Sequence, residues 1–377
     1  MVTRRYFFLV GPLVIFLFIF YLYHPSNSLS APKLVQTIPT ANESFSRPDE
    51  TIFRPGHARP AGANYSRILV FGKLKNEDTS WVEHELPNLQ AAIYVVDDDS
   101  ATLKVPKNKG HEAMVYLTYI IDHYDTLPDT SLFFHSHKST WHNNILLNLD
   151  TAFTIESLSD ARVAREGYFN SRCHHDPGCP DWLHLDRPEE EWDLVKKTEE
   201  RYFTSDLWQE LHPGAPFPAS ISQPCCAQFA VSKERIRARP LSEYVRYREW
   251  LLNTDLEDEI SGRIMEYTWQ YIFAGVSEFC PAMHVCYCDG YGACFGGAQQ
   301  LQDWMDILRR REVSDAEISV LLDAGDQDSE SLKFLRKQSD ELNKELSARK
   351  EEAFRQGDNP RNRAVEAGRE WEEGDGF

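Results

Sequence analysis

The order of apolar segments between residues 68 and 137 constrains the fold more than any other feature of the chain. Short apolar runs typical of buried strands occupy residues 68–71, 92–96 and 131–134. Two segments that begin with helix-favouring residues lie between them, at 79–86 and 108–124. This alternation is typical of a parallel sheet whose strands are joined by crossover helices. The sequence therefore predicts an α/β domain with a mostly parallel sheet and flanking helices.

Polar clusters follow all three predicted strands, at residues 73–78, 97–99 and 135–138. The carboxyl ends of parallel strands meet at one edge of a sheet, and ligands bind there, where the strand order reverses. The three clusters therefore predict a single polar site at that edge.

Two pairs of side chains in these clusters suit ligand binding. Asp97 and Asp98 can accept hydrogen bonds from ribose hydroxyls and base N–H groups, although aspartates at strand ends also form solvated turns. His135 and His137 are two residues apart and therefore share one face of a strand. They could ligate Mn²⁺ or Zn²⁺, bind a diphosphate directly together with Lys138, or serve as hydrogen-bonded structural histidines.

Residues 6–23 carry no charged side chain. A helix of this length spans roughly 27 Å, which is enough for a thin bilayer. Arg4 and Arg5 precede this run, and the next Lys or Arg is Lys33. The positive-inside rule then predicts a cytoplasmic tail at 1–5, a transmembrane signal-anchor at 6–23 and a luminal remainder. The alternative is a cleaved signal peptide that ends at residues 28–30.

Composition divides the luminal part into three regions. Residues 24–65 hold six prolines among Ser, Asn and Arg, which predicts a disordered stem. Residues 66–300 form the predicted folded domain. Residues 301–377 are charged and helix-prone, and we expect a helical tail with a disordered end.

Charge and cysteine content limit the compartment and the partners. The net charge of -19 argues against a nucleic-acid partner, because phosphate repels such a surface. All eight cysteines lie between Cys173 and Cys294, as expected for disulfides in an oxidising lumen. Glycosylation sequons at Asn42 and Asn64 agree with this compartment.

The cysteines leave two questions open. With neighbouring histidines they could instead bind zinc, which would make the chain a zinc hydrolase. The disulfide connectivity does not follow from the spacings. Cys225 and Cys226 are expected to have different partners, because adjacent cysteines rarely bridge each other.

Residues 68–137 resemble the first half of a GT-A glycosyltransferase, the nucleotide-sugar-binding fold. Asn76-Glu77-Asp78 matches an Asn-Glu-like segment after the first strand of that family, and residues 96–100 match its Val-Asp-Asp-x-Ser motif. Residues 108–110 match an Asn-x-Gly motif that opens a helix. The family's third strand ends in a metal-binding Asp-x-Asp, and this chain has a His-Ser-His sequence there.

The Asn-x-Gly and His-x-Lys arrangement is similar to that of the rhamnan-synthesis branch of glycosyltransferase-like proteins. That branch usually has Arg after the glycine, where this chain has His111. Residues 68–300, with the motifs at 223–229 and 261–269, resemble a largely fungal family described as a domain of unknown function. The resemblance implies that Mn²⁺ would bind at His135 and His137, and that a nucleotide sugar would bind at Asn76, Asp97, Asp98, Asn108, His111 and Lys138.

An inverting sugar transfer needs a carboxylate base that takes the proton of the acceptor. Glu266 is the predicted base, since it lies among aromatic residues on a predicted helix, where partial burial raises a carboxyl pKa. The other interpretation of Glu266 is a helix-surface charge, and Asp255 and Glu259 are weaker candidates for the base. Glu112 is best explained by a favourable interaction with a helix N-terminus.

These features together predict a type II membrane protein of the Golgi or endoplasmic reticulum. It would transfer a sugar from a nucleotide-sugar donor to a glycan or glycoprotein acceptor. The alternative is a catalytically inactive GT-A-like luminal binding or scaffold protein, because the acidic metal motif is missing.

Overall fold

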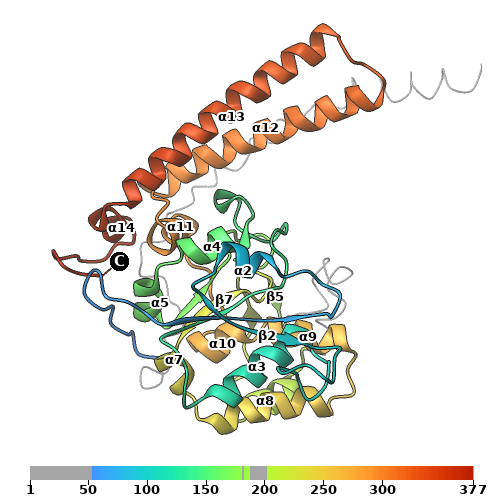
Figure 1. The fold of residues 1–377 in the computed structure, drawn as a ribbon, viewed down its shortest axis with the longest axis vertical. Helices are drawn as coiled ribbons and strands as arrows, with labels where there is room; N and C mark the ends of the chain where they lie inside the picture. The colour runs from blue at the N-terminus through green and yellow to red at the C-terminus, as the bar shows by residue number, and fades with distance from the viewer. Residues whose placement is uncertain (1–52, 181, 187–201, 377) are drawn as a thin grey trace, which may run out of the picture. The chain divides into compact units, whose positions relative to one another are not determined.

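The computed structural model describes residues 53–180, 182–186 and 202–376 (Figure 1). The predicted cytoplasmic tail, signal-anchor, alternative cleavage site and Asn42 sequon, and most of the predicted stem, lie outside these residues. Within the described part, no helix combines the length and the apolar character needed to cross a membrane.

The described residues contain a five-stranded mixed sheet with the strand order β2-β1-β3-β7-β4. Its strands are β1 (Arg67–Lys73), β2 (Gln90–Val95), β3 (Thr130–Phe133), β4 (Tyr168–Asn170) and β7 (Phe229–Ser232). β1 pairs in parallel with both β2 and β3, as the alternation of strands and helices predicts. β7 runs antiparallel to β3 and to β4, so the sheet is mixed rather than mostly parallel in its pairings.

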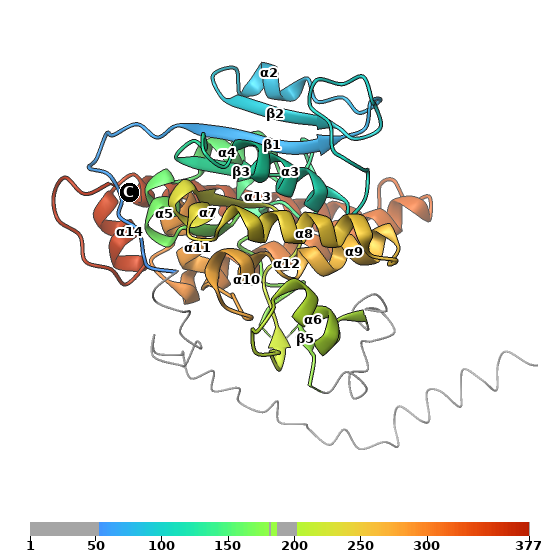
Figure 2. The ribbon, with the colours of Figure 1, turned by 90° about the horizontal axis from the view of Figure 1, so that it is seen from below.

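One face of the sheet is covered by helices around an aromatic core. Tyr116 packs against Phe133, Phe229 and Trp269, with ring centroids 4.9, 5.6 and 6.0 Å away. These helices are α3 (Glu112–His123), α6 (Ser205–Leu211), α7 (Lys233–Arg237), α8 (Leu241–Asn253), α9 (Asp258–Glu266) and α10 (Trp269–Ala274) (Figure 2). This core fixes the N-terminus of α3 beside α9.

The opposite face has its own core, because alternate residues of a strand point to opposite sides. Leu69 and Phe71 of β1 belong to this second core, whereas Val70 belongs to the first. Its helices are α2 (Trp81–Glu85), α4 (Thr151–Ser157), α5 (Asp160–Glu166), α11 (Met283–Tyr291), α12 (Ala298–Asp323) and α13 (Glu330–Gly357). The described part also contains η1 (Ile145–Leu147), β5 (Leu183–His184), β6 (Ser220–Ile221) and α14 (Pro360–Glu366).

α12 and α13 form a long helical hairpin in the region that the sequence marks as a charged helical tail (Figure 1). Trp304 of α12 and Leu346 of α13 belong to the second core. The Trp304 indole N–H also donates to the Leu346 carbonyl at 3.1 Å, which links the two helices. Residues 374–376 return to the domain. There Pro60 and Asp375 form an antiparallel β-bridge.

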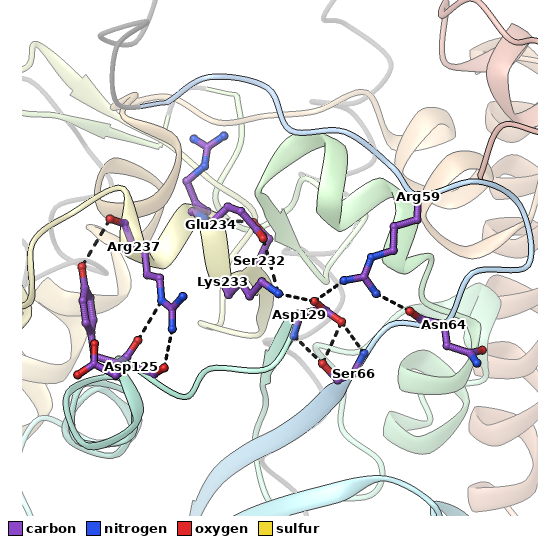
Figure 3. A network of polar contacts seen from close by, with 11 residues as sticks. Arg59, Asn64, Ser66, Asp125, Asp129, Ser232, Lys233, Glu234 and Arg237 are labelled. Carbon is purple, nitrogen blue, oxygen red and sulfur yellow. Dashed lines mark hydrogen bonds and ion pairs between the residues drawn. The ribbon is translucent and has the colours of Figure 1, made fainter.

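The end of the predicted stem, residues 53–66, packs along the domain, and we call it the strap. The ring of Phe53 lies under the guanidinium groups of Arg235 and Arg239, at 5.4 and 5.3 Å. Farther along the strap, Arg59 and Ser66 both bind Asp129, which also pairs with Lys233 (Figure 3). Asp129 therefore joins the strap, the start of β3 and the end of β7.

Four disulfides are present in the described residues and confirm the predicted oxidised framework: Cys173–Cys286, Cys179–Cys280, Cys225–Cys226 and Cys288–Cys294. The expectation that Cys225 and Cys226 have different partners is wrong. The backbone turns sharply at this point, with φ of 85° at Cys226 and 48° at Ala227, which brings the adjacent sulfurs together. Because no cysteine is free, none of the eight is a thiolate ligand for zinc.

Candidate functional site

The polar clusters that follow β1, β2 and β3 lie at the same edge of the sheet, because the three strands are parallel. The loop after β1 contacts the loop after β2. The Lys75 backbone N–H donates to Asp97 Oδ1 at 2.8 Å, and the Lys75 ammonium lies 2.8 Å from Asp98 Oδ2. Asn76 is exposed in the same loop. The structure thus brings Asn76, Asp97 and Asp98 together.

Both oxygens of the Asp98 carboxylate have partners within the chain. Lys75 binds one, and the backbone N–H and hydroxyl of Ser100 donate to the other. The hydrogen bonds from Lys75 and Ser100 hold the pKa of Asp98 well below its usual range. Asp98 therefore stabilises the loop, and Asp97 keeps more capacity to accept a hydrogen bond from a ligand.

Glu77 connects the loop after β1 to the segment after β3. Its Oε2 accepts from the Leu74 backbone N–H at 2.8 Å and from the Ser136 hydroxyl at 3.3 Å, and its Oε1 lies 4.0 Å from His137 Nε2. Lys138 pairs with Glu85 of α2. A cleft of about 480 Å³ opens here and is lined by Glu77, Asp78, Ser80, Trp81, His84, Glu85, Ser136, His137, Lys138 and Ser139.

His135 is half-buried just after β3, the central strand of the sheet. Its Nδ1 lies 3.1 Å from His142 Nε2, and its backbone N–H donates to Gln228 Oε1 at 3.2 Å. Its Nε2 is buried and has no hydrogen-bond partner among the described residues. Burial, followed by the charges of His142, His137 and His111, lowers the pKa of His135 to about 3. The imidazole is therefore neutral at physiological pH and keeps a free ring nitrogen.

The start of α3 is held against α9. His111 precedes α3 with φ of 49°, and its Nε2 lies 3.4 Å from Asp258 Oδ2, while the Gly110 backbone N–H donates to Asp258 Oδ1. A Cβ added at Gly262 would lie 3.2 Å from the His111 Cβ. Asn108 is exposed in the same loop. The close contact at Gly262 thus sets the position of His111.

Asp258, Gly262 and Glu266 are four residues apart along α9 and therefore line one face of the helix. The same face that fixes His111 thus carries the predicted base. The side chain of Glu266 is only 13% exposed. Its Oε1 accepts from the Cys226 backbone N–H at 2.6 Å, and its Oε2 accepts from Arg263 at 3.1 Å. Both oxygens of the Glu266 carboxyl group therefore have hydrogen-bond donors within the chain.

Glu112, the first residue of α3, is the partner of Glu266 that the sequence interpretation missed. Burial, followed by the nearby charge of Glu266, raises the pKa of Glu112 to about 8, although Arg263 acts in the opposite direction. Glu112 is therefore protonated near neutral pH. A protonated carboxyl group that interacts electrostatically with a second carboxyl group is an arrangement that acid–base catalysis uses. Asp255 and Glu259 are exposed.

The segment 223–228 links the two halves of the site. Gln223 Nε2 donates to the Glu266 carbonyl at 2.6 Å, and Gln223 Oε1 accepts from the Tyr168 hydroxyl at 2.9 Å. Gln228 binds the His135 backbone through Oε1 and donates to Asn143 through Nε2. Both buried glutamines therefore hold the Cys225–Cys226 bridge between α9 and the end of β3.

The site extends across both faces of the sheet. Glu112 and Glu266 lie on the α3 face, whereas Lys138 lies on the α2 face beside the cleft. His135 and His137 lie between them at the edge. The structure therefore places His111 near Glu112 and Glu266, and it places Lys138 beside Glu85. His111 and Lys138 do not lie on the same side of the sheet.

The described residues contain one group of three potential metal-binding side chains with their ligand atoms in mutual reach: Cys288, Cys294 and Glu366. The two sulfurs of that group are joined in a disulfide. His135 and His137 do not form such a three-ligand group with their neighbours in this part of the chain. We therefore assign no chemical step to Mn²⁺, and metal dependence stays a prediction.

Residues 69–289 match the family described as "Protein of unknown function (DUF3431)", which is more than half of the chain. The chain belongs to this family. The DUF3431 region includes every predicted site residue from Asn76 to Glu266, and also Glu112. No curated protein and no protein of known structure matches the chain.

Proposed function

We propose that the chain is a glycosyltransferase that moves a sugar from a nucleotide-sugar donor to a hydroxyl of a glycan or glycoprotein. The observation that supports this function best is the carboxyl pair of Glu112 and Glu266. The pair lies beside His111, whose charge also acts on His135 at the sheet edge. Asp97 lies at the same edge, where α/β sheets bind nucleotides.

In the proposed reaction Glu266 is the base. It takes the proton of the acceptor hydroxyl while the acceptor oxygen forms a bond to the anomeric carbon. The bond between that carbon and the donor phosphate breaks, and the diphosphate leaves with the electron pair. Glu112 then donates its proton to the departing phosphate oxygen. Each turnover leaves Glu266 protonated and Glu112 ionised, and exchange with solvent restores both.

Donor binding in this proposal uses Asn76, Asp97, Asn108 and His111, which line the loops after β1 and β2 and before α3. Asp98 would act indirectly, since it holds Lys75. Lys138 would reach a phosphate only by leaving Glu85, and a donor would reach the buried Nε2 of His135 only after a local opening of the site.

The proposal includes a location, a type II membrane protein of the Golgi or endoplasmic reticulum. The four disulfides support an oxidising compartment of the secretory type. The second candidate function is a catalytically inactive binding or scaffold protein. It is favoured by the intramolecular pairing of Asp98 and Lys138, two of the predicted donor ligands.

The test uses the full-length chain and a panel of UDP- and GDP-sugars, with and without Mn²⁺. We expect one donor to be hydrolysed or transferred, and we expect Glu266→Gln to lower the rate by about 100-fold or more. Glu259→Gln is the matched control, because Glu259 is an exposed carboxylate on the same helix. It should leave the rate unchanged.

Each outcome of this test has a meaning. Donor binding without turnover by the wild-type chain would support the scaffold function instead. Turnover that survives in Glu266→Gln would remove Glu266 as the base. A chain that neither binds nor converts any donor in the panel would contradict both candidate functions.

A further inference from the structure

An exposed indole lies next to the histidine pair of the sheet edge. Trp141 is in the segment between β3 and η1 and is 66% exposed. Its ring lies 5.4 Å from that of His142, edge to face, and His142 in turn bonds to His135. Trp141 therefore continues the wall of the candidate site onto the molecular surface.

The inner face of the Trp141 ring is covered by a fixed cation. The Arg172 guanidinium lies 5.3 Å from the ring centre. Arg172 is buried and donates to the carbonyls of His142 and Asp176, at 2.6 and 2.7 Å. A cation held in this way over an indole stabilises the ring orientation. Most of the exposed area is therefore on the side of the ring that faces away from Arg172.

The backbone that follows Trp141 is also fixed. Asn143 and Asn144 are buried, and their side-chain amides donate to the carbonyls of Leu149 and Ser171, at 3.0 and 2.6 Å. An aromatic ring on such a rigid segment loses little freedom when a ligand binds. A large exposed side chain that is held rigidly at the edge of a polar site is typical of a binding surface.

We propose that the outer face of Trp141 stacks on a pyranose ring of a glycan acceptor. This inference rests on the proposed function and narrows its acceptor to glycans. An indole offers a flat apolar face for the C–H side of a sugar. The Thr140 hydroxyl, which lies 3.2 Å from His142 Nδ1, is a neighbouring polar group for the sugar hydroxyls. A surface that combines one flat ring with polar neighbours fits a sugar better than the apolar side chains of a protein partner.

The experiment measures binding of mannotriose, cellotriose and chitotriose to the full-length chain by saturation-transfer NMR. At least one trisaccharide should bind the wild-type chain. Trp141→Ala should weaken that binding about tenfold or more, whereas Trp141→Phe, which keeps an aromatic face, should stay within about threefold. Phe334→Ala is the matched control, because Phe334 is a similarly exposed aromatic residue on α13, and it should have no effect.

A parallel measurement separates this inference from the proposed function. Nucleotide-sugar binding is followed by thermal shift in the same variants, and Trp141→Ala should leave the shift unchanged. If it abolishes the shift, the ring stacks on the nucleobase and the inference is overturned. The inference is also overturned if no trisaccharide binds, or if Trp141→Ala binds the trisaccharide as tightly as the wild-type chain does. The chain could bind a trisaccharide through Trp141 and yet bind no nucleotide sugar. This result would support the sugar-stacking role of Trp141 and contradict the proposed glycosyltransferase function.

Discussion

Glu112 is the residue with the clearest link between environment and chemistry. Burial and the charge of Glu266 raise its pKa to about 8. In the unfolded chain a glutamate has a pKa near 4.5. Between pH 4.5 and pH 8, Glu112 is therefore protonated in the folded chain and ionised in the unfolded chain. Stability from this group is therefore present at low pH and falls as the pH rises toward 8.

The first prediction tests this linkage with Glu112→Gln. The free energy of unfolding of the wild-type chain should decrease between pH 5 and pH 8, by up to about 1.4 kcal/mol per pH unit from this group. The amide cannot ionise, so the variant should lack that part of the decrease. Urea unfolding at pH 5, 6.5 and 8 measures both slopes. Equal slopes would show that Glu112 is ionised in the folded chain.

Asp289 is a second residue whose environment has a measurable consequence. It is 1% exposed and accepts from Arg162, Arg165 and Arg369. Burial raises the pKa of Asp289, but the three guanidinium groups outweigh burial and lower it overall. The carboxylate thus neutralises cations that come from α5 and from the segment after α14.

The second prediction is that Asp289→Asn destabilises the fold by about 3 kcal/mol or more, because it leaves buried guanidinium groups without a counter-charge. Chemical denaturation followed by circular dichroism measures the loss. Asp306→Asn removes an exposed carboxylate that pairs with Arg309, and it should cost less than about 1 kcal/mol. Similar effects of the two substitutions would contradict the role assigned to Asp289.

At the scale of elements, the contact between α3 and α9 builds the candidate site. Gly262 allows α9 to approach His111, and the same face of α9 carries Asp258 and Glu266. A methyl group at this point would push His111 and the first residue of α3 away from the sheet edge. Donor binding should be more sensitive to that shift than folding is, because His111 is exposed and belongs to neither core.

The third prediction is that Gly262→Ala weakens nucleotide-sugar binding about tenfold, while the melting temperature of the unliganded chain falls by only a few degrees. Isothermal titration and thermal unfolding give the two values. Glu259→Ala, an exposed position of α9, is the control and should change neither. Unchanged binding in Gly262→Ala would separate the α3–α9 contact from the donor site.

Several elements could be predicted from the sequence because their signals are local. The apolar runs at 68–71, 92–96 and 131–134 indicated β1, β2 and β3, and their order indicated parallel pairing. The direction of β7 had no such signal, since a short apolar run does not tell which strand it will join. The pairing of Cys225 with Cys226 also depends on backbone angles that the residue types do not reveal.

The candidate site was predictable in part for the same reason. Asp97 and His137 follow predicted strands, so the parallel order alone placed them at one edge. Glu112 and Glu266 are far apart in the sequence and meet only through the packing of α3 on α9. Glu112 was therefore interpreted from its local position at a helix start, which does not reveal a second carboxyl group beside it.

At the scale of the whole described chain, the strap ties distant segments together at Asp129. Burial raises the pKa of Asp129, but hydrogen bonds from Lys233, Ser66 and Arg59 outweigh it and hold the pKa well below its usual range. An aspartate with a lowered pKa contributes stability above the pKa of the unfolded chain, and this contribution is lost as the pH falls through the folded-state value.

The fourth prediction is that Asp129→Asn lowers stability by about 1 to 3 kcal/mol at pH 7 and makes the strap accessible to protease. Limited chymotrypsin digestion should cleave after Phe53 or Tyr65 faster in the variant. The difference in the free energy of unfolding between the variant and the wild-type chain should shrink in strong acid, where Asp129 is protonated in both the folded and the unfolded state. Unchanged digestion would show that the strap is held by its other contacts, such as that of Phe53.

The disulfide between Cys225 and Cys226 makes the geometry around Glu266 depend on oxidation of the chain. The Cys226 backbone N–H reaches Glu266 because the adjacent sulfurs fix an unusual turn. Reduction of the bridge would remove the covalent constraint on the turn that holds this donor. If the proposed function is correct, formation of this bond in the oxidising compartment would help to set the position of the proposed base.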